Sequence, residues 1–320
     1  MIMKKTMYRI TSLAVALMLI VSAIPFSAFA ANYCTDSECV CAFNPNDPAP
    51  ATGMIEAGNY HSVFVDPDGT VFAVGSEKLS KYNNRSNRCD VWDWEDIVQV
   101  SASSHTVGLK ADGTAVAVGV NKYGQCNVSR WKNIVSVFAG DNHTVGLKAD
   151  GTVVAVGDNS DGQCNVSRWK NIVQVAAGEK TTYGLTEDGR VLSAGKKNYG
   201  AGWKDIIAID AGPYHLVGLK EDGTVVQTGG CDSWGKGKST DSWEDIVAIS
   251  AGPAFTLGLM SDGTVVAVGN SSANKGQCDV SDWYDIVAIS AGMHHSLGLM
   301  SDGTIVAAGS NAYNQCDIAD

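Results

Sequence analysis

Short runs of apolar residues that alternate with polar ones recur along most of this chain. In one stretch, residues 134–137 are followed by the alternating run 143–147, the pair Asp150-Gly151 and the apolar run 153–156. A period of two over four to eight residues predicts β-strands. Asp-Gly between two such runs predicts a hairpin, because glycine accepts the positive φ of the turn. No part of this pattern has the spacing and caps of a helix, so an all-β chain is expected.

The pattern occurs seven times. Consecutive Asp-Gly pairs are 34 to 44 residues apart and begin at residues 68, 112, 150, 188, 222, 262 and 302. We expect a fourth short strand where Cys is followed by Asn or Asp and then Val or Ile. Four short strands repeated seven times predict a seven-bladed β-propeller of four-stranded blades. A parallel β-helix is the alternative, but its coils are normally shorter and need no hairpins.

The two ends of the repeat region complement each other. The chain stops at residues 315–320, before the first strand of another unit, and residues 54–58 provide such a strand directly before His61. We therefore expect one blade to combine the N- and C-terminal strands and to close the ring, which would hide two open sheet edges.

The first thirty residues have the pattern of a secretory signal peptide. Lys4, Lys5 and Arg9 precede the mostly apolar run 10–24, and Ala28-Phe29-Ala30 fits a cleavage site near Ala30. We expect a signal peptide over 1–30, a tail containing Cys and Pro over 31–50, and the propeller over 51–320. The mature protein is then extracellular and has no membrane span.

The amino-acid composition excludes some classes of function for this protein. Of 320 residues, 34 are Asp or Glu and 23 are Lys or Arg, giving a net charge of −11. A nucleic-acid ligand is not expected, because such sites present a basic face. The hydrophobic share of 45% and the charged share of 18% exclude a disordered acidic chain.

The repeated motifs resemble a known family. Ala-Gly-x-x-His-Ser/Thr-x-x-Leu, Asp-Gly-Thr-Val-Val-Ala-Val-Gly and Gly-Gln, found over residues 54–318, resemble the regulator of chromosome condensation repeat. The secretion signal, the short repeat and the run at 57–62 are most similar to its bacterial secreted branch, which includes the type II β-lactamase inhibitory protein. The resemblance implies a seven-bladed propeller whose loops at one end form a protein-binding face.

The nine cysteines form two groups. Five share one repeat position and are too far apart around a ring for disulfides, so we expect them to be small buried apolar residues: Cys89, Cys126, Cys164, Cys278 and Cys316. The other four form an even set for which secretion permits one or two disulfides, with a metal site as the less favoured alternative: Cys34, Cys39, Cys41 and Cys231.

Histidine and aspartate are repeated rather than unique. Five His share one register, and we expect each to fix its own blade through a backbone hydrogen bond: His61, His105, His143, His215 and His295. Turn chemistry explains the seven Asp of the Asp-Gly pairs. Six aligned Trp are expected to pack inside the fold. No unrepeated acid, base and nucleophile set is found, so we predict a non-enzymatic protein without cofactor or metal.

Recognition is predicted in the loops that vary between units. Two variable residues follow each Ala-Gly, and all seven pairs should lie at one end of the propeller. The residues that we expect to bind a partner are Asn59, Tyr60, Asp141, Asn142, Glu179, Lys180, Tyr214, Phe255, Met293 and His294. The expected partner is another protein, with inhibition of a β-lactamase or a cell-wall enzyme as one form of this role.

A second set of loops suggests an alternative function. Residues 76–93, 196–202 and 231–242 carry eight basic side chains, among them Arg88, in an otherwise acidic chain, and could meet an anionic wall polymer. Trp92, Trp234 and Tyr199 would be the contacts of a propeller that binds cell-wall carbohydrate. The sequence leaves this alternative open.

Overall fold

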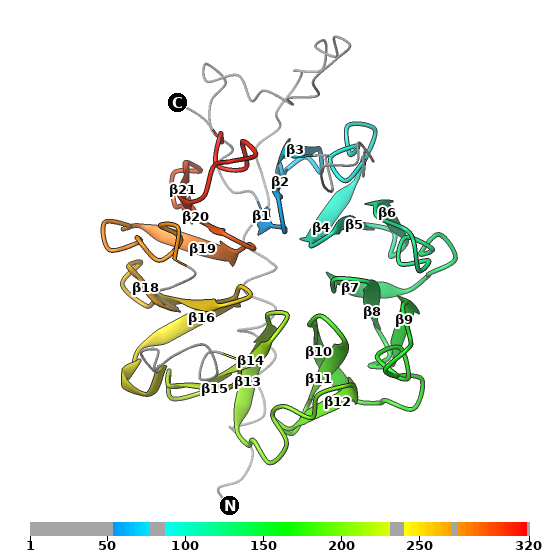
Figure 1. Cartoon of the computed structure of the whole chain (residues 1–320). Helices are drawn as coiled ribbons and strands as arrows, with labels where there is room; N and C mark the ends of the chain where they lie inside the picture. The colour runs from blue at the N-terminus through cyan, green and yellow to red at the C-terminus, as the bar shows by residue number, and fades with distance from the viewer. Residues whose placement is uncertain (1–53, 77–86, 231–239, 270–273, 319–320) are drawn as a thin grey trace, which may run out of the picture. The chain divides into compact units, whose positions relative to one another are not determined.

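The computed structural model describes residues 54–76, 87–230, 240–269 and 274–318 as seven antiparallel sheets in chain order (Figure 1). Each sheet has three consecutive strands, and the second strand lies between the other two. A short 3-10 helix, η1 (Thr240–Ser242), precedes the sixth sheet. The predicted signal peptide, the tail, and Cys34, Cys39, Cys41 and Cys231 lie outside the described residues.

The three strands of successive sheets have nearly constant lengths. The first strands are β1 (Met54–Ala57), β4 (Ile97–Ala102), β7 (Ile134–Ala139), β10 (Ile172–Ala177), β13 (Ile206–Ala211), β16 (Ile246–Ala251) and β19 (Ile286–Ala291). The second strands are β2 (His61–Val65), β5 (His105–Lys110), β8 (His143–Lys148), β11 (Thr181–Thr186), β14 (His215–Lys220), β17 (Phe255–Met260) and β20 (His295–Met300). The third strands are β3 (Val71–Gly75), β6 (Ala115–Gly119), β9 (Val153–Gly157), β12 (Val191–Gly195), β15 (Val225–Gly229), β18 (Val265–Gly269) and β21 (Ile305–Gly309).

The Asp-Gly pairs form the predicted turns between second and third strands. Gly113 has a φ of 77°, and the Asp112 carboxylate accepts a 2.9 Å hydrogen bond from the Thr114 backbone N–H. The turn also has a role beyond its own sheet, because the Gly113 carbonyl accepts a 3.0 Å bond from the N–H of Ile134 in the next sheet. The repeated turn therefore connects neighbouring sheets.

The apolar core lies between neighbouring sheets. One cluster joins Val63 and Val71 of the first sheet with Val91, Trp94 and Val100 of the second unit. The tryptophans pack as predicted: a Cβ at Gly146 of β8 would lie 2.8 Å from the Trp131 ring, and the other five aligned tryptophans have an equivalent glycine. Glycine is needed there because the ring covers the strand directly.

The predicted fourth strand is absent from the described sheets. In the third unit, Cys126 and Val128 lie in a turn that is held by a 2.9 Å bond from the Val128 N–H to the Cys126 carbonyl. Val128 is buried, so its side chain contributes to the core although its backbone joins no sheet. The repeated apolar residue therefore reflects burial rather than strand pairing.

The two ends of the repeat region meet differently from the expectation. The first sheet contains only β1, β2 and β3, so no described sheet combines strands from both chain ends. Ile318 instead packs with Ile55, Phe64 and Leu297 in a cluster between the first and last sheets. The N–H of Ala57 donates a 2.9 Å bond to the Ser290 hydroxyl across the same boundary.

The five aligned histidines connect sheets, which corrects the predicted bond to their own backbone. Each imidazole Nε2 lies 2.6–2.9 Å from a hydroxyl in a neighbouring sheet: His61 with Thr106, His105 with Thr144, His143 with Thr182, His215 with Thr256 and His295 with Ser62. Burial lowers the pKa of His143, His215 and His295 to about 4. These residues are neutral structural groups near neutral pH.

Candidate protein-binding face

The loops between first and second strands converge on one small pocket. Residues from all seven loops line a space of about 60 Å³. The lining residues whose identity varies between the loops are Asn59, Ser103, Asp141, Pro213, Pro253 and Met293. The first variable residue of six of the seven loops thus lines one shared pocket. We call these seven loops the loop face.

Asp141 connects three of the loops. Its carboxylate accepts a 3.0 Å bond from the Ser103 hydroxyl and a further bond from the Asn59 side chain. The N–H of Asn59 donates to the Ser103 carbonyl at 3.1 Å. Burial and the neighbouring Glu179 raise the pKa of Asp141. The first three loops therefore form a bonded unit with an acidic group at its centre.

The second variable residue of several loops contacts the preceding unit. The rings of Tyr60 and Tyr313 meet edge to face, with centroids 5.1 Å apart, and the Arg88 guanidinium lies 5.7 Å from the Tyr60 centroid. His294 is close enough to Lys275 for that charge to lower its pKa, after the larger effect of burial. The loop face therefore extends outward onto the connections that follow the third strands.

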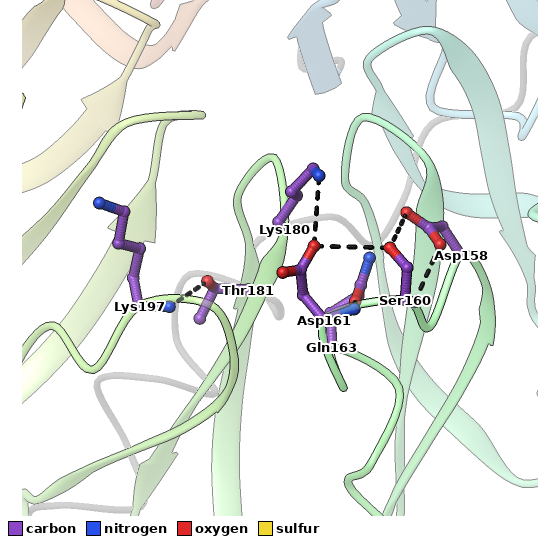
Figure 2. A network of polar contacts seen from close by, with 7 residues as sticks. All are labelled: Asp158, Ser160, Asp161, Gln163, Lys180, Thr181 and Lys197. Atoms are coloured by element: carbon purple, nitrogen blue, oxygen red, sulfur yellow. Dashed lines mark hydrogen bonds and ion pairs between the residues drawn. The ribbon is translucent and has the colours of Figure 1, made fainter.

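Figure 2 shows the same relationship between Lys180 and Asp161. The Lys180 ammonium lies 3.2 Å from the Asp161 carboxylate, and Ser160 bonds the carboxylate of Asp158 at 3.1 Å. The Gln163 side chain accepts a 3.0 Å hydrogen bond from the Asp161 N–H, which fixes the conformation of the connection between β9 and β10. Lys180 is thus engaged within the protein, and the charge of Glu179 adds to that of Asp161 in raising the Lys180 pKa.

Exposed tyrosines surround this centre. Tyr214 is 44% exposed, and both Glu179 and Asp141 contribute to raising its pKa after burial. Tyr313 and Tyr123 are each 45% exposed. The sequence analysis missed these last two residues. The sequence contains a pattern that could have identified them. The residue two positions before each aligned Gln differs between units, as the predicted binding residues do: Tyr123, Asp161, Lys275 and Tyr313.

Phe255 was wrongly placed among the exposed residues. It is fully buried at the start of β17, within the cluster that contains Leu257 and Trp283. It occupies the position of the aligned histidines, where the side chain points between sheets. Arg88 is likewise fully buried, so it does not belong to an exposed basic surface. Asn59, Tyr60, Asp141, Asn142, Glu179, Lys180, Met293 and His294 are partly exposed, as a contact surface requires.

The aromatic residues predicted for carbohydrate binding differ in their exposure to solvent. Trp92 is 75% exposed. Tyr199 is partly buried in a core cluster, and its ring lies 5.6 Å from the Lys197 ammonium. Trp234 lies outside the described residues. The three aromatic residues are therefore not shown to form one surface.

Two partly buried carboxyls were not foreseen. Glu56 of β1 and Asp210 of β13 both precede the alanine that ends a first strand. Burial, then the charge of Asp210, raise the pKa of Glu56 to about 8. Asp210 accepts bonds from the N–H groups of Ala251 and Ala211 at 2.7 and 2.8 Å. Within the described ranges, no group of three His, Cys, Asp or Glu side chains could hold a metal ion, and no helix has the length and apolarity of a membrane span.

Comparison with known proteins identifies the repeat. The regulator of chromosome condensation (RCC1) repeat matches residues 134–163, 172–201, 246–277 and 286–315, which confirms the resemblance for these four units. None of the curated proteins matches the chain. The match to a bacterial secreted branch stays a prediction.

Solved structures show the same β-propeller fold. Prp20p from Saccharomyces cerevisiae, described with its binding to Gsp1p and histones, is 17% identical with a TM-score of 0.58, covering 76% of this chain and 81% of that one. The ectodomain of the Arabidopsis thaliana receptor kinase ACR4 is 19% identical with a TM-score of 0.58, covering 80% and 97%. Yeast RCC1 (Prp20) bound to Kap60 is 15% identical with a TM-score of 0.56, covering 90% and 87%.

Proposed function

We propose that this chain, four of whose units are RCC1 repeats, is a secreted propeller that binds another protein through its loop face. The observation that carries the proposal is the convergence of all seven loops on one pocket beside exposed tyrosines. Tyrosine and other aromatic residues often anchor protein interfaces because they bury a large area and still donate a hydrogen bond. The solved structures with this fold include yeast Prp20, which is described with its binding to Gsp1p and histones and, in a second structure, bound to Kap60.

A closed ring of blades is part of this proposal. Contacts of β1 with β19 and β20 support it, together with the packing of Ile318 against the first sheet. Closure would hold the seven loops at fixed distances, so that a partner meets a preorganised surface and loses less conformational entropy on binding.

The charge of the face favours a partner with a basic contact surface. Asp141 and Glu179 lie near the exposed Tyr214 ring. The chain as a whole carries a net charge of −11, which would steer a basic partner toward it at low ionic strength. Inhibition of a β-lactamase or a cell-wall enzyme is the specific form of this role that we propose to test first.

The test compares two variants of the mature protein, residues 31–320. The loop variant carries Tyr60→Ala, Tyr214→Ala and Tyr313→Ala. The control carries Tyr284→Ala and Val287→Ala, which remove exposed apolar side chains near the start of β19, at the end of the sheet away from the loops. Circular dichroism and thermal unfolding establish that both variants fold.

Each protein is used to capture partners from envelope and culture-fluid proteins, and each is assayed as an inhibitor of a purified β-lactamase. Capture of a defined protein by the parent and the control, with a loss of at least tenfold in affinity for the loop variant, supports the proposal. Equal capture by both variants, or no capture by the parent, overturns it. Inhibition of the β-lactamase by the parent and the control, but not by the loop variant, would establish the specific role.

A further inference from the structure

A second pocket lies in the fifth sheet, away from the loop face. It is an open hollow of about 700 Å³ whose lining includes Trp203, Lys204, Asp205, Lys220, Glu221 and Asp222. β13 begins at Ile206 and β14 ends at Lys220, so the pocket lies at the end of the sheet opposite the loop that joins these strands. Its volume is within the range of small-molecule sites.

Gly202 is one of the residues that line this pocket. Gly202 precedes Trp203, whereas Arg130 and Arg168 precede the equivalent Trp131 and Trp169. A Cβ added at Gly202 would meet no atom of residues beyond its chain neighbours within 4 Å, so the space at this position is open. The backbone φ of Gly202 is 84°, a conformation that favours glycine. Gly202 therefore contributes only backbone to the lining.

Trp203 gives the pocket a rigid apolar wall. A Cβ at Gly218 would lie 2.8 Å from the Cζ3 atom of the Trp203 ring, so the ring lies directly on β14 and cannot turn freely. Ile206 and Val226 add apolar surface to the lining. A fixed aromatic wall of this kind suits a ligand with a flat apolar face.

The polar groups around this wall nearly balance in charge. Two lysines, at 204 and 220, face three carboxyls, at 205, 221 and 222. One oxygen of Asp222 already accepts bonds from the Thr224 N–H and hydroxyl at 3.0 and 2.6 Å. A phosphate or another strongly anionic ligand would require an excess of basic groups, so the site favours a neutral ligand with several hydrogen-bonding groups.

We propose that this pocket binds a neutral sugar ring of an oligosaccharide. A pyranose ring has an apolar C–H face that can lie against Trp203. Its hydroxyls can donate to the Glu221 and Asp205 carboxylates and accept from the Lys220 and Lys204 ammonium groups. The third sheet has Lys148, Ala149 and Asp150 in place of Lys220, Glu221 and Asp222, which provides a matched control. The proposal does not depend on the function of the loop face.

The experiment follows the indole N–H signals of the ¹⁵N-labelled mature protein by NMR during titration with maltose, cellobiose and chitobiose. Trp203→Phe assigns the Trp203 signal by its disappearance. Gly202→Arg introduces a long side chain at a lining position next to Trp203, where the third and fourth units have arginine, and Lys220→Met removes one ammonium group. Lys148→Met is the control at the equivalent position of the third sheet. The dispersion of the remaining indole signals reports whether each variant is folded.

We expect at least one disaccharide to shift the Trp203 signal saturably, with a Kd on the order of millimolar. Gly202→Arg should weaken that binding at least tenfold and Lys220→Met about threefold to tenfold, while Lys148→Met leaves it unchanged. The proposal is overturned if no disaccharide shifts the Trp203 signal, or if folded Gly202→Arg binds as well as the parent.

Discussion

The imidazole Nε2 of His295 lies 2.9 Å from the hydroxyl of Ser62, although 233 positions separate the two residues in the chain. The Ser62 hydroxyl donates a 2.7 Å bond to the Gln315 carbonyl, so the oxygen of Ser62 accepts its bond from the Nε2–H of His295. The same arrangement connects neighbouring sheets at four other histidines. The last sheet is therefore bonded to the first by the contact that connects consecutive sheets elsewhere.

Ser62→Ala should destabilise the protein by about 1–3 kcal/mol, because it leaves the His295 N–H and the Gln315 carbonyl buried without their partner. Urea unfolding followed by circular dichroism measures the change. Ser261→Ala, in an exposed turn, is the control and should change the free energy of unfolding by less than about 0.5 kcal/mol. Equal effects of the two substitutions would contradict the role assigned to the Ser62 hydroxyl.

Gly146→Ala should destabilise the protein by about 1–3 kcal/mol, because the added methyl group would overlap the Trp131 ring, whose Cζ3 atom lies 2.8 Å from the Cβ position. Thermal unfolding by calorimetry provides the measurement. The control is Ala149→Ser, since Ala149 lies in an exposed turn after β8. An unchanged melting temperature for Gly146→Ala would show that the ring can move aside.

Glu56 should make stability depend on pH. Its folded pKa of about 8 is above its ordinary value of 4.5, so the folded protein holds this proton more tightly than the unfolded chain. Stability is therefore highest below about pH 4.5 with respect to this group and falls as the pH rises toward 8. Glu56→Gln, which cannot ionise, should be more stable than the parent at pH 8 by on the order of 1–3 kcal/mol.

Melting temperatures of the parent and of Glu56→Gln between pH 5 and pH 8 test this expectation. The difference between them should grow with pH. Asp302→Asn is a useful control, because hydrogen bonds from Thr304 lower the pKa of Asp302 below its ordinary value of 3.8, so its contribution to stability does not change between pH 5 and pH 8 and its difference from the parent should stay constant. A difference that stays constant across this range would show that Glu56 ionises at its ordinary pKa.

Three of the aligned cysteines should react slowly in the folded protein. Burial raises the thiol pKa of Cys126, Cys164 and Cys316 to about 11, so about a thousandth of each is thiolate at pH 8. Mass spectrometry after brief iodoacetamide treatment should find these thiols unmodified in buffer and fully modified in urea. Rapid alkylation in buffer would indicate that the connections containing them open readily.

Much of the fold follows from local patterns. Period-two runs predicted the first, second and third strands, since alternation of apolar and polar residues is a property of the strand itself. The Asp-Gly pairs predicted the hairpins because the Asp side chain bonds the backbone two residues on, as Asp112 does with Thr114. The repeated Cys-Asn-Val segment was interpreted as a strand, but burial of Val128 gives the same pattern without strand pairing.

The sequence by itself determined the all-β class, the seven units, the turns and the place of the variable loops, because each depends on interactions between residues close together in the chain. Only the tertiary structure decided which side chains meet. Tyr60 contacts Tyr313, and Glu56 lies near Asp210. Phe255 is buried, whereas Tyr214 is exposed. Such contacts depend on how sheets pack over long sequence distances, and no local period records that packing.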